Sequence, residues 1–570
     1  MTGLAFFLAA ALAWQPAEGW VERPDPVASV RARKGGTIRF SGGQCPKSYN
    51  AYLDNNTYTR MTFDLMYENL LTIDSTTLDF SPGLARRWAV SADGREFTFE
   101  LDPQAAWSDG APVTADDVKW TFDAVLAPAS ETGSWKAILG AFESPEVLDA
   151  RTVRFRKKGE SPRDWRDLMH CGLFWILPKH AFAGREFNKA SLVGMPVGGP
   201  YRLARVDEQV ESEFRRETNW WRRDRPSAQG LYNFDRVVMR YYADNENAFE
   251  ALKKKAIDVY PVYSARIMNA ETKGEKFARN WILKRRVRNK SPIGFQGFAM
   301  NMRRPPFDSL KVRQAMAKLV DRETMNRTMM NGEYFLQKSY CEDLYDAAHP
   351  CRNPVWPFDV AGAKRLLAEA GFAKGFAFTF LSRSAGEDKF LSLFTQALAA
   401  CGVKMEIVRK DFAGWMRDMD AYHFDMTWAA WGASVFRNPE TSWAAAEGRR
   451  PGGNNVTGLD VPAIDALVAA EKRMDSAAER ADAYREIDRL VAEQVPYVLL
   501  WNTNEHRILY WNKFGTPRAI LGRIGDEDGV LTYWWYDDDR AHELDRAMKN
   551  GTCLPSVPLR VDFDQPGEAR

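Results

Sequence analysis

The chain is too long to fold around one hydrophobic core, and this limits its possible architectures more than any single motif does. It has 570 residues, whereas single cores stop growing at about 250–300 residues, so we expect roughly two to four folding units. Phe97–Leu101 (FTFEL) alternates like a half-buried strand, and Thr114–Asp117 (TADD) is a capping box that opens a helix. Such segments mix without strict alternation or short repeat, which predicts an α/β chain with large lobes.

The most informative local stretch is Phe424–Glu440 (FDMTWAAWGASVFRNPE). A short apolar run with Trp428 and Trp431 breaks at Gly432 and leaves through a polar turn, which predicts a buried strand followed by a loop. Two interpretations stay open. The tryptophans could be ordinary core residues, as composition alone favours, or they could line a binding loop at the end of the strand.

The charge balance and the aromatic content indicate which kinds of binding partner to expect. Lys plus Arg number 78 against 76 for Asp plus Glu, and no block of like charge occurs, so nucleic acid is not an expected partner. Aromatic residues make up 13% of the chain, with 20 tryptophans. They could fill the cores, and they also suit a large cleft that grips a ligand through flat apolar faces.

The N-terminus has the pattern of a secretory signal peptide, which we place at residues 1–20. Leu4–Ala13 is apolar and ends in the A-x-A form, although the usual basic start of such peptides is missing. The alternative is a buried apolar N-terminal segment. Since the first cysteine is Cys45, a lipid anchor is not supported, and export to the periplasm is the expected localisation.

Cysteines, histidines and catalytic motifs give little sign of an enzyme. Cys341 and Cys351 could close a small disulfide loop, and a metal site that includes His349 is the weaker alternative. The histidines are scattered, and no G-x-S-x-G, H-E-x-x-H, P-loop or dinucleotide motif occurs. We therefore expect no enzyme, no metal and no cofactor; only His423, beside the 424–440 stretch, merits attention.

Eight segments follow one another along the chain: GGTIRF (35–40), SPGLARRWAVSADGREFTFEL (81–101), WSDGAPVTADDVKWTFD (107–123), GGPYRL (198–203), ADNENAFEALKKKAIDV (243–259), MNMRRPPFDSLKVRQAM (300–316), DVAGAKRLLAEAGF (359–372) and NNVTG (454–458). In this order they resemble the family 5 extracellular solute-binding proteins, the peptide/nickel/opine type that serves ABC importers. The likeness covers roughly residues 35 to 515, and Tyr510–Gly515 (YWNKFG) is similar to an element of the oligopeptide-binding Yej-type subgroup.

The resemblance implies a two-lobed α/β periplasmic-binding-protein fold of class II (large, cluster C type) with an additional inserted subdomain, and a ligand enclosed between the lobes. Lobe I would combine residues 35–65, 195–290 and 496–545, the inserted subdomain would span 66–194, and lobe II would span 291–495. The implied partners are an oligopeptide or small organic solute and the permease subunits of an ABC transporter in the inner membrane. The protein would act as a monomer.

One position departs from the family pattern. Dipeptide and oligopeptide binders carry an aspartate for the ligand's α-ammonium shortly after the tryptophan, and Ser434 is the best match here. A buried ammonium without a carboxylate is costly to desolvate. Trp428 likewise stands where some relatives have a peptide-binding arginine. The resemblance therefore implies a ligand that is less charged or more aromatic than a peptide with a free N-terminus.

The ligand-binding candidates follow from these segments. Trp428, Trp431 and Gly432 would supply stacking and apolar contact, and Ser434 a hydrogen bond. The other candidates are Gln44 and Tyr49 in the loop after the first strand, and Asn454 and Asn455 in the polar turn. Import is the expected role; signalling to a receptor and periplasmic hydrolysis are the alternatives.

Overall fold

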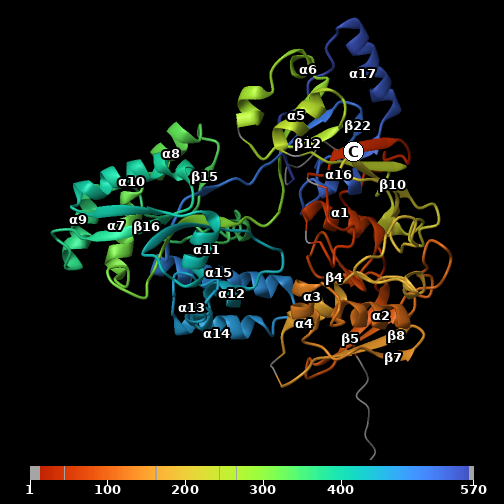
Figure 1. Cartoon of the computed structure of the whole chain (residues 1–570), viewed down its shortest axis with the longest axis horizontal. Coiled ribbons are helices and arrows are strands. Elements are labelled where there is room, and N and C mark those ends of the chain that lie inside the picture. Colours follow the sequence, from red (N-terminus) through yellow and green to blue (C-terminus); the bar gives the residue numbers. More distant parts are fainter. Residues whose placement is uncertain are drawn as a thin grey trace, which may run out of the picture. The chain divides into compact units, whose positions relative to one another are not determined.

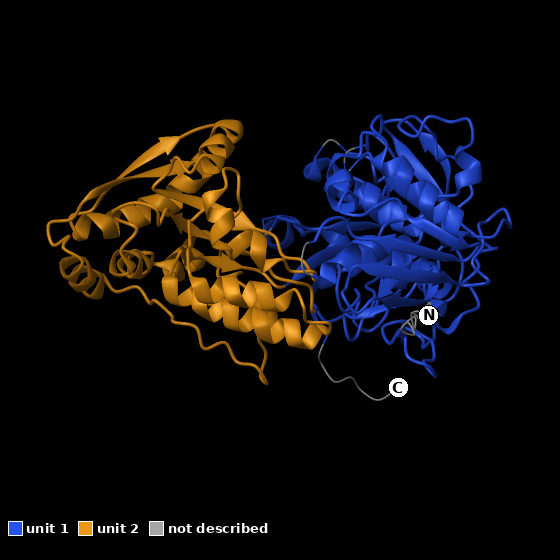
Figure 2. Cartoon of the chain, turned by 90° about the horizontal axis from the view of Figure 1, so that it is seen from below, with its two compact units in different colours: residues 1–289, 505–570 blue, residues 290–504 orange. Residues whose placement is uncertain are grey.

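The chain folds as two compact units, which Figure 2 shows in different colours. Unit 1 comprises Met1–Asn289 and Glu505–Arg570, and unit 2 comprises Lys290–Asn504. The computed structural model describes residues 13–43, 45–54, 56–160, 163–242, 244–264 and 266–563. Each unit contains a mixed sheet with helices and its own hydrophobic clusters, which confirms the predicted α/β class. The lobe boundaries expected from sequence stay a prediction.

The main sheet of unit 1 is built around a short buried strand, β2 (Thr37–Ser41), in which Ile38 and Phe40 are fully buried. β2 runs parallel to both of its neighbours, β11 and β12. The chain continues from the carboxyl end of β2 into the loop that contains Tyr49. Across the sheet the order is β24 (Arg560–Asp562), β13 (Ile282–Arg288), β21 (His506–Trp511), β12 (Val259–Pro261), β2, β11 (Arg236–Arg240), β10 (Glu211–Arg216) and β9 (Tyr201–Asp207).

Helices cover the main sheet because alternate strand residues are apolar. Cores form on both faces: Tyr260 and Leu509 belong to one hydrophobic cluster, and Val259 and Tyr510 to another. The first cluster includes residues of α5 (Asn245–Lys253), α6 (Glu275–Ala278) and α17 (Asp538–Asn550). The second includes residues of α1 (Thr57–Met66) and α16 (Asp528–Tyr533), and Figure 1 shows these helices beside the sheet.

A second sheet of unit 1 has the order β1 (Trp14–Gln15), β5 (Ala85–Val90), β6 (Glu96–Leu101), β8 (Thr152–Arg156) and β7 (Glu146–Asp149). The FTFEL strand is confirmed as β6, and the capping box is confirmed at the start of α2 (Ala115–Leu126). Nearby lie α3 (Gly133–Leu139), α4 (Trp165–Gly172) and the hairpin of β3 (Leu71–Ile73) and β4 (Phe80–Pro82). One hydrophobic cluster runs from this sheet to the main one. The inserted subdomain at 66–194 stays a prediction. β22 (Phe514–Gly515) pairs with β23 (Trp535–Tyr536).

Unit 2 is a sheet between two helical layers. The strand order is β17 (Lys404–Arg409), β16 (Ala377–Ser382), β18 (Met426–Trp431), β14 (Phe295–Met300) and β19 (Tyr497–Leu499). One face packs against α7 (Leu310–Leu319), α9 (Val360–Glu369) and α10 (Asp388–Ala400). The other packs against α11 (Phe412–Asp420), α12 (Pro439–Trp443), α14 (Pro462–Glu471) and α15 (Ala477–Gln494). Smaller elements are α8 (Arg322–Met329), α13 (Ala445–Arg449) and the pair β15 (Phe335–Leu336) and β20 (Trp501–Asn502).

The predicted disulfide between Cys341 and Cys351 is wrong, because both residues are free thiols in the structure. The loop that carries them is held instead by Asp488 of α15, which is 2% exposed. Its carboxylate accepts hydrogen bonds within the range 2.6–2.8 Å, from Ser339 Oγ, Tyr340 N, Tyr345 Oη and Asn353 Nδ2. A buried carboxylate with this many donors fixes the loop without a covalent link.

The predicted signal peptide lies largely outside the described residues and stays a prediction. Within the described part, Trp14–Gln15 pairs with β5 of unit 1. No helix among the described residues combines the length and the apolar character that a membrane span requires.

Candidate ligand-binding site

The stretch 424–440 folds as predicted into a strand, β18, and a following loop, but its two tryptophans point to opposite faces of the sheet. Successive side chains of a strand alternate between faces, so residues three apart diverge. Trp428 belongs to the cluster under α7 and α10, whereas Trp431 packs against the cluster under α11 and α15. The two residues therefore have different roles.

Trp428 is a core residue. It is 9% exposed, and its Nε1 donates to Gln296 Oε1 at 3.0 Å. Aromatic rings pack edge-on around it at centroid distances of 5.4–5.9 Å, from Phe298, Phe390 and Trp501. Its ring faces are thus occupied by protein, and the ligand-stacking role predicted for Trp428 has no support here.

Trp431 and the loop after it are more accessible. Trp431 is half-buried, and its Nε1 donates to Tyr497 Oη at 3.1 Å. Gly432 and Ser434 are exposed. A methyl group added at Gly432 would meet nothing within 4 Å, so the space beside this loop is open. The Ser434 hydroxyl accepts from the Phe436 amide at 3.1 Å and keeps its own hydrogen for another acceptor.

A buried ion pair anchors the far end of this loop. Arg437 binds Asp343, and the two side chains are 13% and 11% exposed. Asp343 also accepts from the Ile293 amide at 2.9 Å, and Tyr484 Oη donates to the Arg437 carbonyl at 3.2 Å. The loop is therefore anchored at one end by β18 and at the other by this ion pair, which restricts its conformations before any ligand binds.

The two candidate asparagines, Asn454 and Asn455, also differ in their exposure to solvent. Asn454 is exposed. Asn455 is 1% exposed, and its amide nitrogen donates to the carbonyls of Ala444 and Leu459 at 3.0 and 2.8 Å. Its oxygen accepts from the Leu459 amide at 3.0 Å. Asn455 thus ties its turn to the end of α12, and a ligand-binding role for it has no support in the structure.

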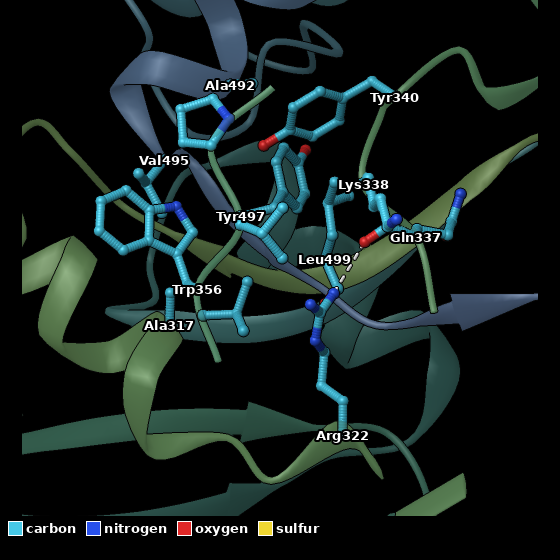
Figure 3. A pocket seen from close by; sticks show the side chains of 13 residues that line it. Ala317, Arg322, Gln337, Lys338, Tyr340, Trp356, Ala492, Val495, Tyr497 and Leu499 are labelled. Atoms are coloured by element: carbon cyan, nitrogen blue, oxygen red, sulfur yellow. Dashed lines mark hydrogen bonds between the residues drawn. The ribbon is translucent and has the colours of Figure 1, made fainter. Parts of the chain in front are cut away.

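Figure 3 shows a cavity of unit 2 that lies beside Tyr497. Tyr340 and Trp356 line it, together with Arg322, whose Nη1 donates to the carbonyls of Gln337 and Leu499 at 2.8 Å. Its volume is only about 30 Å³. This is room for about two water molecules, so the cavity is a packing gap and not a solute pocket.

In unit 1, Tyr49 lies in a hydroxyl network at the end of β2. Its hydroxyl is 2.8 Å from that of Tyr241, which in turn is 2.7 Å from Ser212 Oγ. Burial raises the pKa of Tyr49, so its hydroxyl remains protonated and can donate. The other candidate in this loop, Gln44, lies outside the described residues.

Close to Tyr49 along the chain, a tyrosine-lined pocket of about 190 Å³ opens beside Ser41 and Gly43. The hydroxyls of Tyr58 and Tyr263 are 3.5 Å apart, and Tyr263 also donates to the Glu527 carboxylate. Burial raises the pKa of Tyr58 to about 12, with the Glu527 charge adding to the effect, and burial raises the pKa of Glu527. The pocket offers aromatic faces and hydroxyls, and Tyr263 connects it to the Glu527 carboxylate.

Sequence reasoning missed this pocket. Tyr260 lies in β12 and Tyr263 lies two residues beyond its last residue, Pro261, and both tyrosines line the pocket. A strand end rich in tyrosine was a usable signal. What the sequence did not reveal is that Tyr58, about 200 residues earlier, meets the same pocket.

Comparisons with known proteins agree with this architecture. The profile of the bacterial extracellular solute-binding proteins, family 5, matches residues 79–452. A binding protein of Brucella suis is 28% identical over 505 residues, which is 80% of each chain. YejA of Agrobacterium fabrum, named as a peptide-binding protein, is 25% identical over 566 residues, covering 89% of this chain and 90% of that protein.

A solved structure shows the same fold. DppA of Helicobacter pylori, an ABC transporter-associated periplasmic binding protein in complex with the peptide STSA, has a TM-score of 0.63 at 19% identity. The match covers 89% of this chain and 99% of that one. The fold class is therefore that of the two-lobed periplasmic binding proteins, as predicted.

The family follows from the profile. The chain belongs to family 5 of the bacterial extracellular solute-binding proteins, a family of substrate-binding proteins. The matched segment includes β18 and the whole loop from Gly432 to Asn438. This is the family that the order of sequence motifs predicted.

Proposed function

We propose that this protein captures a peptide or a peptide-like small organic solute and delivers it to the permease of an ABC transporter. The observation that carries the proposal is the family 5 match, which includes the preorganised loop after β18. Trp431, Gly432 and Ser434 of unit 2 would contact the solute, as would Asn454. Tyr49 and the tyrosine-lined pocket would contribute from unit 1.

Two named relatives support the peptide class. YejA of Agrobacterium fabrum carries a peptide-binding name, and DppA of Helicobacter pylori was solved with a tetrapeptide. The local chemistry argues for a modified or N-blocked peptide, because Ser434 provides no carboxylate for an ammonium group. If an ammonium is bound beside the tyrosine-lined pocket, its carboxylate partner would be Glu527, which accepts a hydrogen bond from the pocket residue Tyr263.

We further propose a periplasmic location, monomeric action and no catalytic activity. The relatives' role as binding proteins supports this, since a binding protein needs only a ligand that favours one of its conformations. Hydrolysis of a bound solute by the pure protein would contradict this part of the proposal.

Ligand-dependent thermal stabilisation tests the proposed function. The protein is screened against free and N-acetylated peptides, sugars and opine-like compounds, and each hit is repeated with Trp431→Ala. We expect the substitution to reduce affinity at least tenfold. The matched control is Phe412→Ala, an exposed aromatic residue of the same unit on α11. Equal affinity of Trp431→Ala and the wild type would exclude the loop as the site.

A further inference from the structure

Unit 1 contains a cavity of about 830 Å³ that the proposed function does not use. It lies by the carboxyl end of α1, the β3–β4 hairpin and the end of α16; Figure 1 labels α1, β4 and α16. Residues 21–26, which follow the predicted signal peptide, form another wall. Its volume falls within the range of about 300–1,000 Å³ that is usual for small-molecule sites.

The cavity is lined by more acids than bases. The only basic residues of its described lining are Arg23, which is exposed, and Arg222, which lies 3.5 Å from the carboxylate of Glu22. The acidic lining residues are Glu22, Asp25, Asp64, Glu68 and Asp74.

Two of these carboxylates lie at and just beyond the end of α1. Asp64 is in the last turn of the helix, and Glu68 follows it by two residues, after the extended residue Tyr67. Both line the cavity. Asp64 accepts from Trp175 Nε1 at 2.6 Å, and Glu68 accepts from the indoles of Trp220 and Trp221 at 3.1 and 2.8 Å. Within the described part of the chain neither carboxylate forms a salt bridge, and indole donors hold both of them. Arg60 near Asp64, and Arg222 and Arg225 near Glu68, offset part of their charge.

Tyr67, which stands between Asp64 and Glu68 in the sequence, has a hydroxyl without a hydrogen-bond partner among the described residues. Tyr67 lines the cavity and is 1% exposed. Such a hydroxyl is costly to bury unless something satisfies it. The walls also include the rings of Trp220, Tyr232 and Tyr533, and aromatic faces attract cations.

The electrostatics agree with this geometry. Loss of surrounding solvent raises the pKa of Asp64 to about 6, with Arg60 opposing the shift and Asp528 adding to it, although the side chain itself is exposed. Burial raises the pKa of Glu68, and Arg222 and Arg225 oppose this shift. A bound cation would stabilise the charged forms further.

From the cavity, its unpaired carboxylates, the buried hydroxyl and the aromatic walls, we propose a second binding site in unit 1 for a small organic cation that carries ammonium groups. The carboxylates of Asp64 and Glu68 would neutralise the charge. The Tyr67 hydroxyl would hydrogen-bond the ligand, and the aromatic rings would cover its hydrocarbon part. This proposal does not depend on the proposed solute site.

Calorimetry with spermidine as the probe tests this site on the full chain. We expect one spermidine per protein, and no heat from the uncharged analogue 1,8-octanediol. Asp64→Asn removes the charge and keeps an oxygen for Trp175, so it should weaken binding at least tenfold. Tyr67→Phe should weaken it several-fold. The control is Glu186→Gln, since Glu186 is an acid of unit 1 whose side chain is 72% exposed.

Three results would overturn the proposal. They are no binding by the wild type, unchanged affinity in an Asp64→Asn variant with a native circular dichroism spectrum, and displacement of spermidine by equimolar Mg²⁺, which would indicate general attraction to acidic groups. Trp431→Ala separates the two sites. It should leave spermidine binding intact, and Asp64→Asn should leave solute binding intact.

Discussion

At the scale of single residues, Trp428 and Trp431 show that identical side chains three positions apart on a strand can have different packing environments. Trp428 is enclosed by the rings of Phe298, Phe390 and Trp501, whereas Trp431 stands beside an open loop. Both fit the same sequence pattern. Only the alternation of the strand, combined with knowledge of which face each helical layer covers, distinguishes the enclosed tryptophan from the accessible one.

Ser434→Asp should change which ligands the protein accepts. The new carboxylate would lie on the exposed loop, where it can pair with a ligand ammonium at little desolvation cost. We expect peptides with a free N-terminus to gain about 1 kcal/mol or more of binding free energy over their N-acetylated forms. Calorimetry with matched peptide pairs measures this, and Ser434→Asn is the uncharged control. An equal change for both members of a pair would argue against an ammonium contact at this position.

His170 should make unit 1 sensitive to acid. Burial lowers the pKa of His170 to about 4, and Arg166 and Lys157 lower it further while Asp164 opposes them. The unfolded chain, with a histidine pKa of about 6.5, binds the proton more readily. Stability is therefore complete above that value and declines as the pH falls towards 4.

His170→Gln should remove part of this decline, about 1–2 kcal/mol after allowance for the partial exposure of the ring. Urea unfolding of both proteins at pH 7, 5.5 and 4 gives the comparison. Parallel stability curves for the variant and the wild type would contradict the assignment.

At the scale of elements, the loop 338–353 of unit 2 depends on one carboxylate. Asp488→Ala would leave the donors of Ser339, Tyr340, Tyr345 and Asn353 without their acceptor. We expect a loss of about 3 kcal/mol or more of the free energy of unfolding. Chemical denaturation measures it.

The control for Asp488 is on the same helix. Asp482 is 75% exposed and, among the described residues, forms an ion pair only with Arg485 three residues on, so Asp482→Ala should cost a few tenths of a kcal/mol. A loss of similar size in both variants would mean that the buried network does not hold the loop.

Whether the sequence predicts a structural feature depends on how far apart in the chain the residues that form it lie. The strand and loop at 424–440, the strand at 97–101 and the capping box at Thr114 follow from local patterns, because period and capping are short-range properties. The role of Asn455, the free state of Cys341 and the tyrosine-lined pocket do not follow. Each depends on contacts between segments far apart in the chain.

At the scale of the whole molecule, unit 2 is built from one continuous stretch, Lys290–Asn504, with hydrophobic clusters on both faces of its own sheet. We therefore expect the fragment 290–504 to fold alone, because domains carry their own cores. A dispersed NMR spectrum and a cooperative thermal transition would be the evidence.

A fragment that ends at residue 490 is the matched control for this prediction. It loses β19, which pairs with β14 inside the same sheet, so it should fail to unfold cooperatively. If the longer fragment also lacks a cooperative transition, unit 2 depends on unit 1 for its stability.

The central claim is that this family 5 protein captures a solute through the loop after β18, and native mass spectrometry of the protein purified from a bacterial periplasm tests it most directly. We predict a non-covalent adduct with the mass of a peptide or small organic solute, present in the wild type and in Phe412→Ala and absent in Trp431→Ala. An adduct that persists in Trp431→Ala would contradict the site. A wild type without any adduct that is stabilised by none of the screened solutes would contradict the function.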